Sequence, residues 1–546
     1  GFYLFYLLIF VFTSLVLSAT GLDTTTALTA SASAESGFQD GPRLAWVRRC
    51  VNQEDRMSAD TGIHTRTLWG HPIGLSTLFF TELWERFSYY GMRAILILFL
   101  TDTEHGGFAM SSETAGVIYG LYTASVYLVA LPGGWIADRL IGQRKAIFIG
   151  GLIIATGHFS LAIIGEIPFY MGLLLIVVGT GLLKPNVSAI VGGLYPDGGA
   201  RRDAGFSIFY MGINLGAFVG PLVCGYLGQN INWHQGFGAA GVGMIVGLFF
   251  YRNGLKYLGD VGAAPEEDPD IIARNWKNLF GGLGAMALVV VALLGIRTVL
   301  PFTLEDFGVG LGYSVIAIAI LYFAYVLILG GLHRDEKKRV VVIFFLFIGA
   351  ALFWSGFEQA GSGLNLFADR LTNMSIGGFE APASWLQSVN PLFIIILAPV
   401  FSWLWVALMH REPSIPAKFA FGLVLLGVGF LVIAWGATYT SEEGLGVSPA
   451  WLIVTYFFHT VGELCLSPVG LSSITKLAPS KYVGQMMGIW FMGAALGNLF
   501  AGLIGGKFES LPLADLFFSV AMVVIFSGLL FAIFSKPIKK LIGREV

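Results

Sequence analysis

The feature that most limits the fold of this sequence is a series of long apolar runs. Runs of about 18 residues or more, long enough to cross the hydrocarbon core of a bilayer as a helix, recur about fourteen times beyond residue 70. They predict an all-α integral membrane protein, because a helix satisfies its own backbone hydrogen bonds in lipid. The runs are 72–101, 113–137, 146–166, 168–191, 204–229, 235–252, 278–299, 310–332, 339–368, 384–409, 417–438, 448–475, 483–506 and 513–535.

Composition excludes the other broad classes. The chain is 55% hydrophobic and 12% charged, whereas soluble proteins carry about 25% charged residues. A membrane β-barrel would show alternating segments of about ten residues. The three cysteines, at 50, 224 and 465, are too few and too scattered for a disulfide framework. A net charge of −2 without a basic aromatic patch gives no reason to expect a nucleic-acid partner.

Residues 1–66 differ from the rest and are treated as an uncertain N-terminal extension. Residues 1–17 are apolar but lack the positive region of a signal peptide, and residues 20–37 are rich in Thr, Ala and Ser, which is typical of disorder. An over-extended reading frame is the alternative, because Met57 closely precedes the first confident helix. Whether residues 1–56 belong to the native protein stays open, and we assign them no function.

Lysine and arginine gather on one side of the expected bundle. By the positive-inside rule this side faces the cytoplasm, which places both ends of the bundle there. The basic connections carry Arg139, Arg144, Lys145, Arg201, Arg202, Arg252, Lys256, Arg274, Lys277, Arg334, Lys337, Lys338, Arg339, Arg411, Lys418, Lys476, Lys481, Lys536, Lys539, Lys540 and Arg544. The other side has Arg297, Arg370 and Lys507 beside Asp102, Glu104, Glu305, Asp306, Glu442 and Glu443.

The longest polar connection, residues 252–277, divides six runs from eight. This count fits a six-helix half at 67–252, a linker with an inserted helix pair at 253–338, and a second six-helix half at 339–546. Transporters built of such halves bind their substrate near the midplane between them. The apolar core of the inserted pair carries no ionisable residue, so we expect the pair to pack peripherally against lipid.

Four charges interrupt the first apolar run. Glu82, Glu85, Arg86 and Arg93 fall, with Tyr89, within one stripe of the helix about 100° wide. Each ionised side chain at mid-membrane costs about 2.5 to 3.5 kcal/mol, so the stripe must face partners or a water-filled cavity.

The loop between the second and third runs reads Gly133-x-x-x-x-Asp138-Arg139-x-x-Gly142-x-Arg144-Lys145. This pattern resembles the loop signature of the major facilitator superfamily. It implies a tight cytoplasmic turn in which glycine permits unusual backbone angles and the aspartate latches one conformation. The expected latch residues are Asp138, Arg139, Gly142, Arg144 and Lys145.

The charged stripe itself, Glu82-x-x-Glu85-Arg86-Phe87-x-Tyr89-Tyr90-Gly91, resembles the first-helix signature of the proton-dependent oligopeptide transporters. The resemblance covers about residues 66–540, and the inserted pair is similar to that of the bacterial members. Further motifs follow in family order: Gly179-Thr-Gly-Leu-Leu-Lys184-Pro185-Asn186, Phe209-Tyr210-x-x-Ile-Asn214, Trp354-x-x-Phe-Glu358-Gln359, Gln387-x-x-Asn390-Pro391 and Gly462-Glu463-x-x-x-Ser467-Pro468.

The resemblance implies a major facilitator fold and a symporter that imports di- and tripeptides with protons by alternating access. It implies a bacterial inner membrane, with H+ as coupling ion, no cofactor or metal and no obligate protein partner. The implied proton-coupling residues are Glu82, Glu85, Arg86, Arg93, Lys184 and Glu358. The implied substrate-binding residues are Arg86, Tyr89, Tyr90, Tyr127, Lys184, Asn214, Trp354, Gln387, Asn390, Glu463, Ser467 and Trp490.

The residues also support proton coupling without the family. The presumed spans hold four acids, at 82, 85, 358 and 463, and three bases, at 86, 93 and 184. One acid therefore lacks a basic partner, and a buried carboxylate in that position is expected to take up a proton. A zwitterionic peptide adds no net charge, but its carboxylate can break an internal ion pair.

Several alternatives stay open. The same scaffold could carry another solute, such as nitrate or a modified organic anion, or act as a drug antiporter or a non-transporting sensor. The charged groups could form a static salt-bridge network, the amides could bond helices together, and Tyr127 and Trp490 could be packing aromatics. An enzyme is not expected, since no Walker loop, metal-ligand cluster or nucleophile triad is present.

Overall fold

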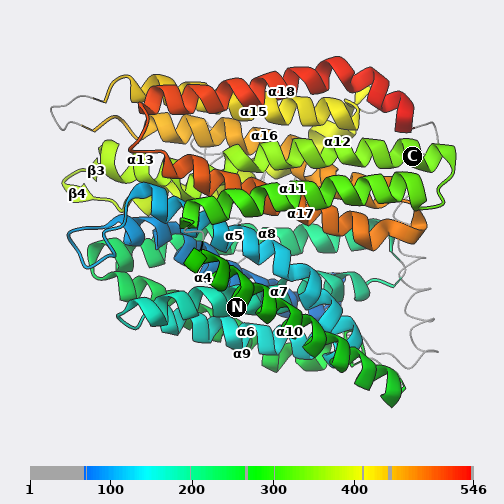
Figure 1. Cartoon of the computed structure of the whole chain (residues 1–546). Helices are drawn as coiled ribbons and strands as arrows, with labels where there is room; N and C mark the ends of the chain where they lie inside the picture. The colour runs from blue at the N-terminus through cyan, green and yellow to red at the C-terminus, as the bar shows by residue number, and fades with distance from the viewer. Residues whose placement is uncertain are drawn as a thin grey trace, which may run out of the picture. The chain divides into compact units, whose positions relative to one another are not determined.

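The computed structural model describes residues 67–68, 70–196, 198–264, 268–299, 302–408, 411–440 and 446–542. The expectations about residues 1–66 lie outside these ranges. The described part, from Thr67 onward, is one compact unit. It contains fourteen helices of 19 to 32 residues, so the predicted all-α architecture is confirmed for this part (Figure 1).

The helices follow the predicted runs closely. The first half is α4 Gly74–Thr101, α5 Ser112–Ile136, α6 Gln143–Leu161, α7 Glu166–Gly193, α8 Gly199–Asn230 and α9 Trp233–Gly254. The inserted pair is α10 Pro269–Val299 and α11 Leu304–Leu329. The second half is α12 Arg334–Phe357, the short α13 Gly363–Leu371, α14 Val389–Leu408, α15 Ile415–Ala437, α16 Ala450–Leu477, α17 Val483–Gly506 and α18 Leu513–Ile542.

Ten helical segments of the described residues are long and apolar enough to cross a membrane. α4 is not among them, because its length includes the four charged residues of the stripe. The predicted run 339–368 is interrupted: α12 ends at Phe357, and a 3-10 turn, Glu358–Gly361, leads into α13. The break between the two helices falls at Ser362, whose φ of −124° and ψ of −100° are not helical.

The two halves repeat one packing scheme. In the first half α4 packs against α8, α5 against α7 and α6 against α9. In the second half the equivalent pairs are α12 with α17, α14 with α16 and α15 with α18. The halves meet where α5 packs against α17 and α8 against α14. This correspondence is an internal repeat of structure in a chain whose two halves show no clear repeat of sequence.

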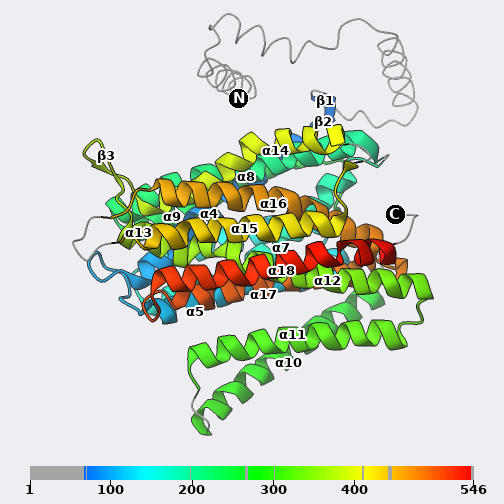
Figure 2. The ribbon, with the colours of Figure 1, turned by 90° about the horizontal axis from the view of Figure 1, so that it is seen from above.

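The inserted pair lies along one side of the bundle (Figure 2). α11 buries one face against α17, α5 and α12, and α10 contacts the turn at residues 137–141. The outer side chains are apolar and exposed, as at Phe280, Leu288, Leu321 and Ile328. The pair is therefore peripheral as predicted, although α11 packs against both halves.

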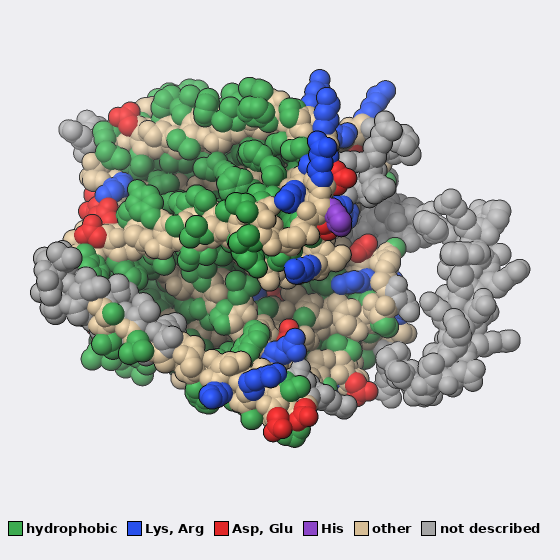
Figure 3. Space-filling view, turned by 45° about the vertical axis from the view of Figure 1, so that its right-hand side comes forward, with side chains coloured by type: hydrophobic (Ala, Val, Ile, Leu, Met, Phe, Trp, Pro, Cys, Tyr) green, Lys and Arg blue, Asp and Glu red, His purple; other side chains and the backbone are tan. Residues whose placement is uncertain are grey.

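The charges divide the bundle into two ends. We call the end with the 102–111 and 507–512 connections the acidic end, and the end with the 137–142 and 330–333 connections the basic end. The short hairpin of β3 Ser375–Ile376 and β4 Phe379–Glu380 lies at the acidic end, and β1 Thr67–Leu68 pairs with β2 His71–Pro72 before α4. Figure 3 shows lysine and arginine gathered toward the basic end and hydrophobic side chains over the flank.

Candidate functional site

The stripe of α4 forms a buried ion cluster. Arg86 Nε lies 3.2 Å from Glu82 Oε1, and Arg86 Nη2 donates to Glu85 Oε1 at 2.6 Å. A further bond from Arg86 Nε to Glu85 Oε2 makes this pair bidentate. The three residues are between 1% and 3% exposed, so water does little to screen their charges. Two acids share one base, which leaves the cluster one negative charge in excess.

Lys184 joins this cluster from α7. Its Nζ lies 4.4 Å from the centroid of the Tyr127 ring, a cation–π contact with α5. It is also within electrostatic range of Arg86, which repels it, and of Glu85, Glu82 and Glu358, which attract it. No carboxylate of the described residues lies within 4 Å of it. The Lys184 ammonium group is therefore near several acids but forms an ion pair with none of them.

Arg93 and Glu358 connect the two halves. Arg93 Nη1 donates to Glu358 Oε2 at 2.6 Å, and both side chains are at most 8% exposed. Glu358 is the first residue of the 3-10 turn after α12, so the end of that helix directs the carboxylate across the interface. The Arg93 guanidinium also lies 5.1 Å from the ring centroid of Tyr90. The structure thus pairs two of the residues implied in proton coupling.

The second half supplies an acid whose hydrogen-bond partner is neutral. Asn390 Nδ2 donates to Glu463 Oε2 at 3.2 Å and to Thr460 Oγ1 at 2.9 Å. Among the described residues no basic group lies within 4 Å of Glu463, which is 8% exposed. The predicted acid without a basic partner is therefore Glu463.

The two halves thus present opposite charges that are not paired, Lys184 from the first and Glu463 from the second. Their surroundings overlap, because Glu358 interacts electrostatically with both. Tyr90 is within electrostatic range of both Arg86 and Glu463. A ligand that carries a carboxylate and an ammonium group would match this pair of charges.

The other predicted substrate-binding residues have varied surroundings. The centroid of the Tyr89 ring lies 5.2 Å from the guanidinium carbon of Arg86. Asn214 donates a hydrogen bond to the Tyr210 carbonyl of its own helix rather than to another helix. Gln387 donates to the Ala94 carbonyl at 3.2 Å, which makes it part of the contact between the halves.

Three more of these residues lie in the second half. Ser467 is half-buried one turn after Glu463 on α16. Trp354 packs against α17, and its indole nitrogen has no hydrogen-bond partner among the described residues. Trp490 packs against Gly470 and, edge to face, against Phe419, which agrees with the packing alternative.

The predicted latch forms a sharp turn at the basic end. Residues 137–141 make a π-helical turn, and Gly142 has φ +82°, as its expected role requires. Asp138 accepts a hydrogen bond from Gln143 Nε2 at 3.1 Å, beside Arg139 and Lys145. Arg144 donates to the carbonyls of Val261 at 2.6 Å and of Gly259. The linker after α9 is therefore tied to this loop, which the sequence did not indicate.

The acidic end is closed by polar contacts between the halves. Asn365 donates to the Ala94 carbonyl at 2.8 Å, and Ser388 donates to the Phe218 carbonyl at 2.7 Å. Gln229 accepts from Ser384 at 2.6 Å. On α4 and α8 these contacts lie between the predicted site residues Tyr90 and Asn214 and the acidic end. The structure therefore describes a state in which the midplane groups are shut off from that end.

Two side chains that follow α17 strengthen this closure: Glu509 accepts a hydrogen bond from Ser112 of the first half, and Lys507 forms an ion pair with Glu113 of the first half. Glu509 accepts from Ser112 at 2.8 Å and from Arg370 at 2.6 Å, and the bond from Arg370 lowers the pKa of the Glu509 carboxyl. Lys507 binds Glu113 of α5 and, at 2.9 Å, Glu305 of α11. These hydrogen bonds raise the pKa of the Lys507 ammonium group. Lys507 thus joins both halves and the inserted pair.

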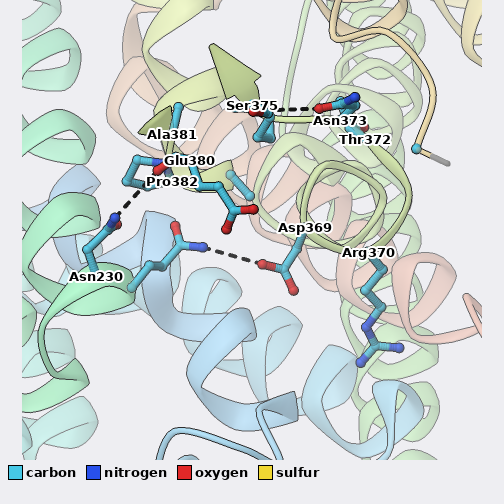
Figure 4. A pocket seen from close by; sticks show the side chains of 13 residues that line it. Asn230, Asp369, Arg370, Thr372, Asn373, Ser375, Glu380, Ala381 and Pro382 are labelled. Atoms are coloured by element: carbon cyan, nitrogen blue, oxygen red, sulfur yellow. Dashed lines mark hydrogen bonds between the residues drawn. The ribbon is translucent and has the colours of Figure 1, made fainter. Parts of the chain in front are cut away.

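A polar cavity of about 460 Å³ opens beside these contacts (Figure 4). Gln229 Nε2 donates to Asp369 Oδ1 at 3.3 Å, and Asn230 donates to the Glu380 carbonyl at 3.4 Å across its wall. The cavity lies at the acidic end, away from the predicted midplane groups. Two of its charged side chains already have protein partners: Asp369 accepts from Gln229, and Arg370 pairs with Glu509.

Sequence reasoning missed residues whose signal is weak. Thr460 accepts a hydrogen bond from Asn390 of another helix. A threonine in a membrane helix usually bonds a carbonyl of its own helix, so its position in the sequence does not indicate a contact with a second helix. The sequence places Lys507 on the side of the bundle that carries mostly acids, without indicating its partners. Its departure from the charge pattern was the available signal for an ionic role.

Comparison with known proteins agrees with these observations. Residues 144–515 match the model of the POT family. The chain is 43% identical over 497 residues to the peptide transporter YePEPT of Yersinia enterocolitica subsp. palearctica, covering 88% of this chain and 97% of that protein. It is 36% identical over 491 residues to a di-/tripeptide transporter of Lactococcus lactis subsp. cremoris, covering 88% and 98%.

Solved structures show the same similarity. A crystal structure of the peptide transporter POT in complex with sulfate superposes with a TM-score of 0.81 at 43% identity, covering 87% of this chain and 97% of that one. A POT family transporter in complex with 5-aminolevulinic acid has a TM-score of 0.79 at 35% identity, with 88% and 99% covered.

Proposed function

The chain belongs to the POT family, and from this premise we propose that it imports di- and tripeptides together with protons. The members of this family are transporters, so the chain is a membrane transporter and not an enzyme. Its relatives include proteins named as peptide and di-/tripeptide transporters. The function requires a site between the halves that binds a zwitterion and responds to a proton.

The observation that carries the proposal is the pair of opposite charges without ionic partners, Lys184 and Glu463. The peptide carboxylate binds beside Lys184 and Arg86, and the peptide ammonium group binds beside Glu463 and Asn390. Because the carboxylate competes with Glu82 and Glu85 for the basic groups, peptide binding changes which acid holds a proton. The coupling ion is H+, and no cofactor takes part.

Direction and energy follow from this arrangement. In a bacterial inner membrane, with both ends of the bundle in the cytoplasm, the acidic end faces outward and the basic end inward. Contact with lipid is made by the exposed apolar side chains of the flank. A potential of about 100 mV gives about 2.3 kcal/mol for one charge that crosses, which sustains roughly a fortyfold gradient of a neutral solute.

Uptake into liposomes tests the proposal. We expect reconstituted protein to accumulate labelled dialanine under an inward pH gradient, and a protonophore to abolish the accumulation. Failure of folded protein to take up dialanine in a gradient-dependent way would refute the proposal. Excess nitrate or an organic anion in place of unlabelled dipeptide is the control for the alternative solutes, and only the dipeptide should compete.

A further inference from the structure

Thr460 occupies a defined place beside the proposed site for the peptide amine. It lies on α16 almost one turn before Glu463, and it is fully buried. Its hydroxyl contacts two groups: the Tyr456 carbonyl of its own helix at 2.7 Å, and Asn390 Nδ2 of α14 at 2.9 Å.

The chemistry of these contacts determines the direction of each bond. A carbonyl oxygen only accepts, so the single proton of the Thr460 hydroxyl is committed to Tyr456. The hydroxyl oxygen can then only accept from Asn390, which requires the NH2 side of that amide to face it. The bond to Thr460 therefore fixes the orientation of the Asn390 amide.

The second N–H of this NH2 group donates a hydrogen bond to Glu463 Oε2, with 3.2 Å between Nδ2 and Oε2. Both amide protons are then used within the protein, and the remaining polar atom of the amide is the Oδ1 acceptor. A peptide ammonium group offers three donors and no acceptor. It is matched by an amide oxygen and a carboxylate, and it would be repelled by an NH2 group in the same place.

We propose that Thr460 is a positioning residue of the peptide-binding site, which holds Asn390 with its carbonyl oxygen available to the substrate amine. The inference rests on the proposed function. Thr460 itself does not touch the peptide: it acts through Asn390. Without the hydroxyl, only the 3.2 Å bond to Glu463 holds the amide, and the substrate ammonium group competes for that carboxylate, so the amide can rotate by half a turn and place a donor where the ammonium group binds.

Substitutions that separate shape from hydrogen bonding test this role. Thr460→Val keeps the shape and removes the hydroxyl, whereas Thr460→Ser keeps the hydroxyl. In dialanine exchange across liposomes, we expect Thr460→Val to raise KM about tenfold with little change in the maximal rate, since a bond to a charged group contributes on that scale. Thr460→Ser should stay within about twofold of wild type. Thr460→Ala replaces the valine variant if that protein does not fold.

A double-substitution cycle tests whether the effect passes through Asn390. In an Asn390→Ala background, Thr460→Val should have no further effect on KM. An unchanged KM in Thr460→Val, an equal loss in Thr460→Ser, or an additive loss in the double variant would overturn the inference. The proposed function fails separately, if wild-type protein exchanges no dialanine at all.

Discussion

Arg86, Lys184 and Glu463 show how single residues set up the chemistry of the site. Arg86 is committed to two carboxylates of its own helix, Glu82 and Glu85. Lys184 and Glu463 have no such ionic partner among the described residues, and they come from different halves. A buried charge without a partner is expensive, and under the proposed function the two ends of a peptide supply both missing charges.

At the residue scale, Lys184→Ala should separate coupling from exchange. Loss of the ammonium group removes the positive charge near Glu82 and Glu85 for which the peptide carboxylate competes in the proposed mechanism, so peptide binding is no longer linked to these acids. We expect proton-driven uptake of dialanine to fall at least about tenfold, a loss of about 1.4 kcal/mol or more, while exchange persists. Lys476→Ala, an exposed lysine at the basic end, is the control and should behave as wild type. Unimpaired driven uptake in Lys184→Ala would remove this residue from the coupling network.

At the scale of helices, the meeting of α5 and α17 depends on glycine. A Cβ on Gly116 would lie 2.5 Å from the Gly502 carbonyl oxygen and 2.7 Å from Gly506 Cα, closer than real Cβ contacts. The backbones therefore approach each other directly where the two halves close, as small residues allow in membrane proteins. The same half-to-half boundary is covered by α11, whose Gly308 lies against both α5 and α17.

A large side chain at this crossing should prevent closure. We expect Gly502→Leu to keep the acidic end from closing and to reduce uptake about tenfold or more, since overpacking costs about 1 to 3 kcal/mol. Two quantities are measured: uptake, and the distance between spin labels at Glu104→Cys in the first half and Leu511→Cys in the second half. This distance should lengthen when the acidic end stays open. Gly484→Leu is the control, because a Cβ at Gly484 meets no atom within 4 Å. Uptake by Gly502→Leu equal to that of the control would contradict the prediction.

For the whole molecule, alternating access requires the contacts at the acidic end to break together. These contacts are spread over α4, α5 and α8 on one side and α13, the 3-10 turn Ala383–Ser388, and Lys507 and Glu509 on the other. Two six-helix halves with the same internal packing can rotate as rigid bodies about the two helix pairs that join them. Lys507 binds Glu305 of α11 as well as Glu113, so the inserted pair takes part in the closed state.

This closure should depend on pH. The bond from Arg370 of the same half and then the bond from Ser112 of the first half lower the pKa of Glu509 from its ordinary value of 4.5. The part that Ser112 supplies stabilises the closed state above about pH 4.5 and is lost as the pH falls through the lowered value. We expect Glu509→Gln to open the acidic end at pH 7 and to flatten the remaining change between pH 7 and pH 4. The spin-label distance between Glu104→Cys and Leu511→Cys measures this.

The pH comparison needs a control carboxylate, because Lys507 also binds the carboxylates of Glu113 and Glu305 at this end. Asp203→Asn, an exposed acid at the basic end, should leave the pH profile of the distance unchanged. If Glu509→Gln keeps the wild-type profile, Glu509 does not contribute to the closed state.

The sequence by itself determined the all-α membrane fold and its helices, and it predicted a division into six, two and six helices and the polar residues of the proposed site. Apolar runs and intramembrane charges are strong local signals in lipid, because each unsatisfied polar group there is costly. The tertiary structure decided which charges pair. Arg93 and Glu358 are 265 positions apart, and only the packing of the two halves brings them together. The same packing leaves Lys184 and Glu463 without ionic partners, turns Asn390 toward Thr460 and closes the acidic end. Hydrogen bonds and ion pairs depend on which helix faces meet, and this is a property of the whole fold rather than of any one segment.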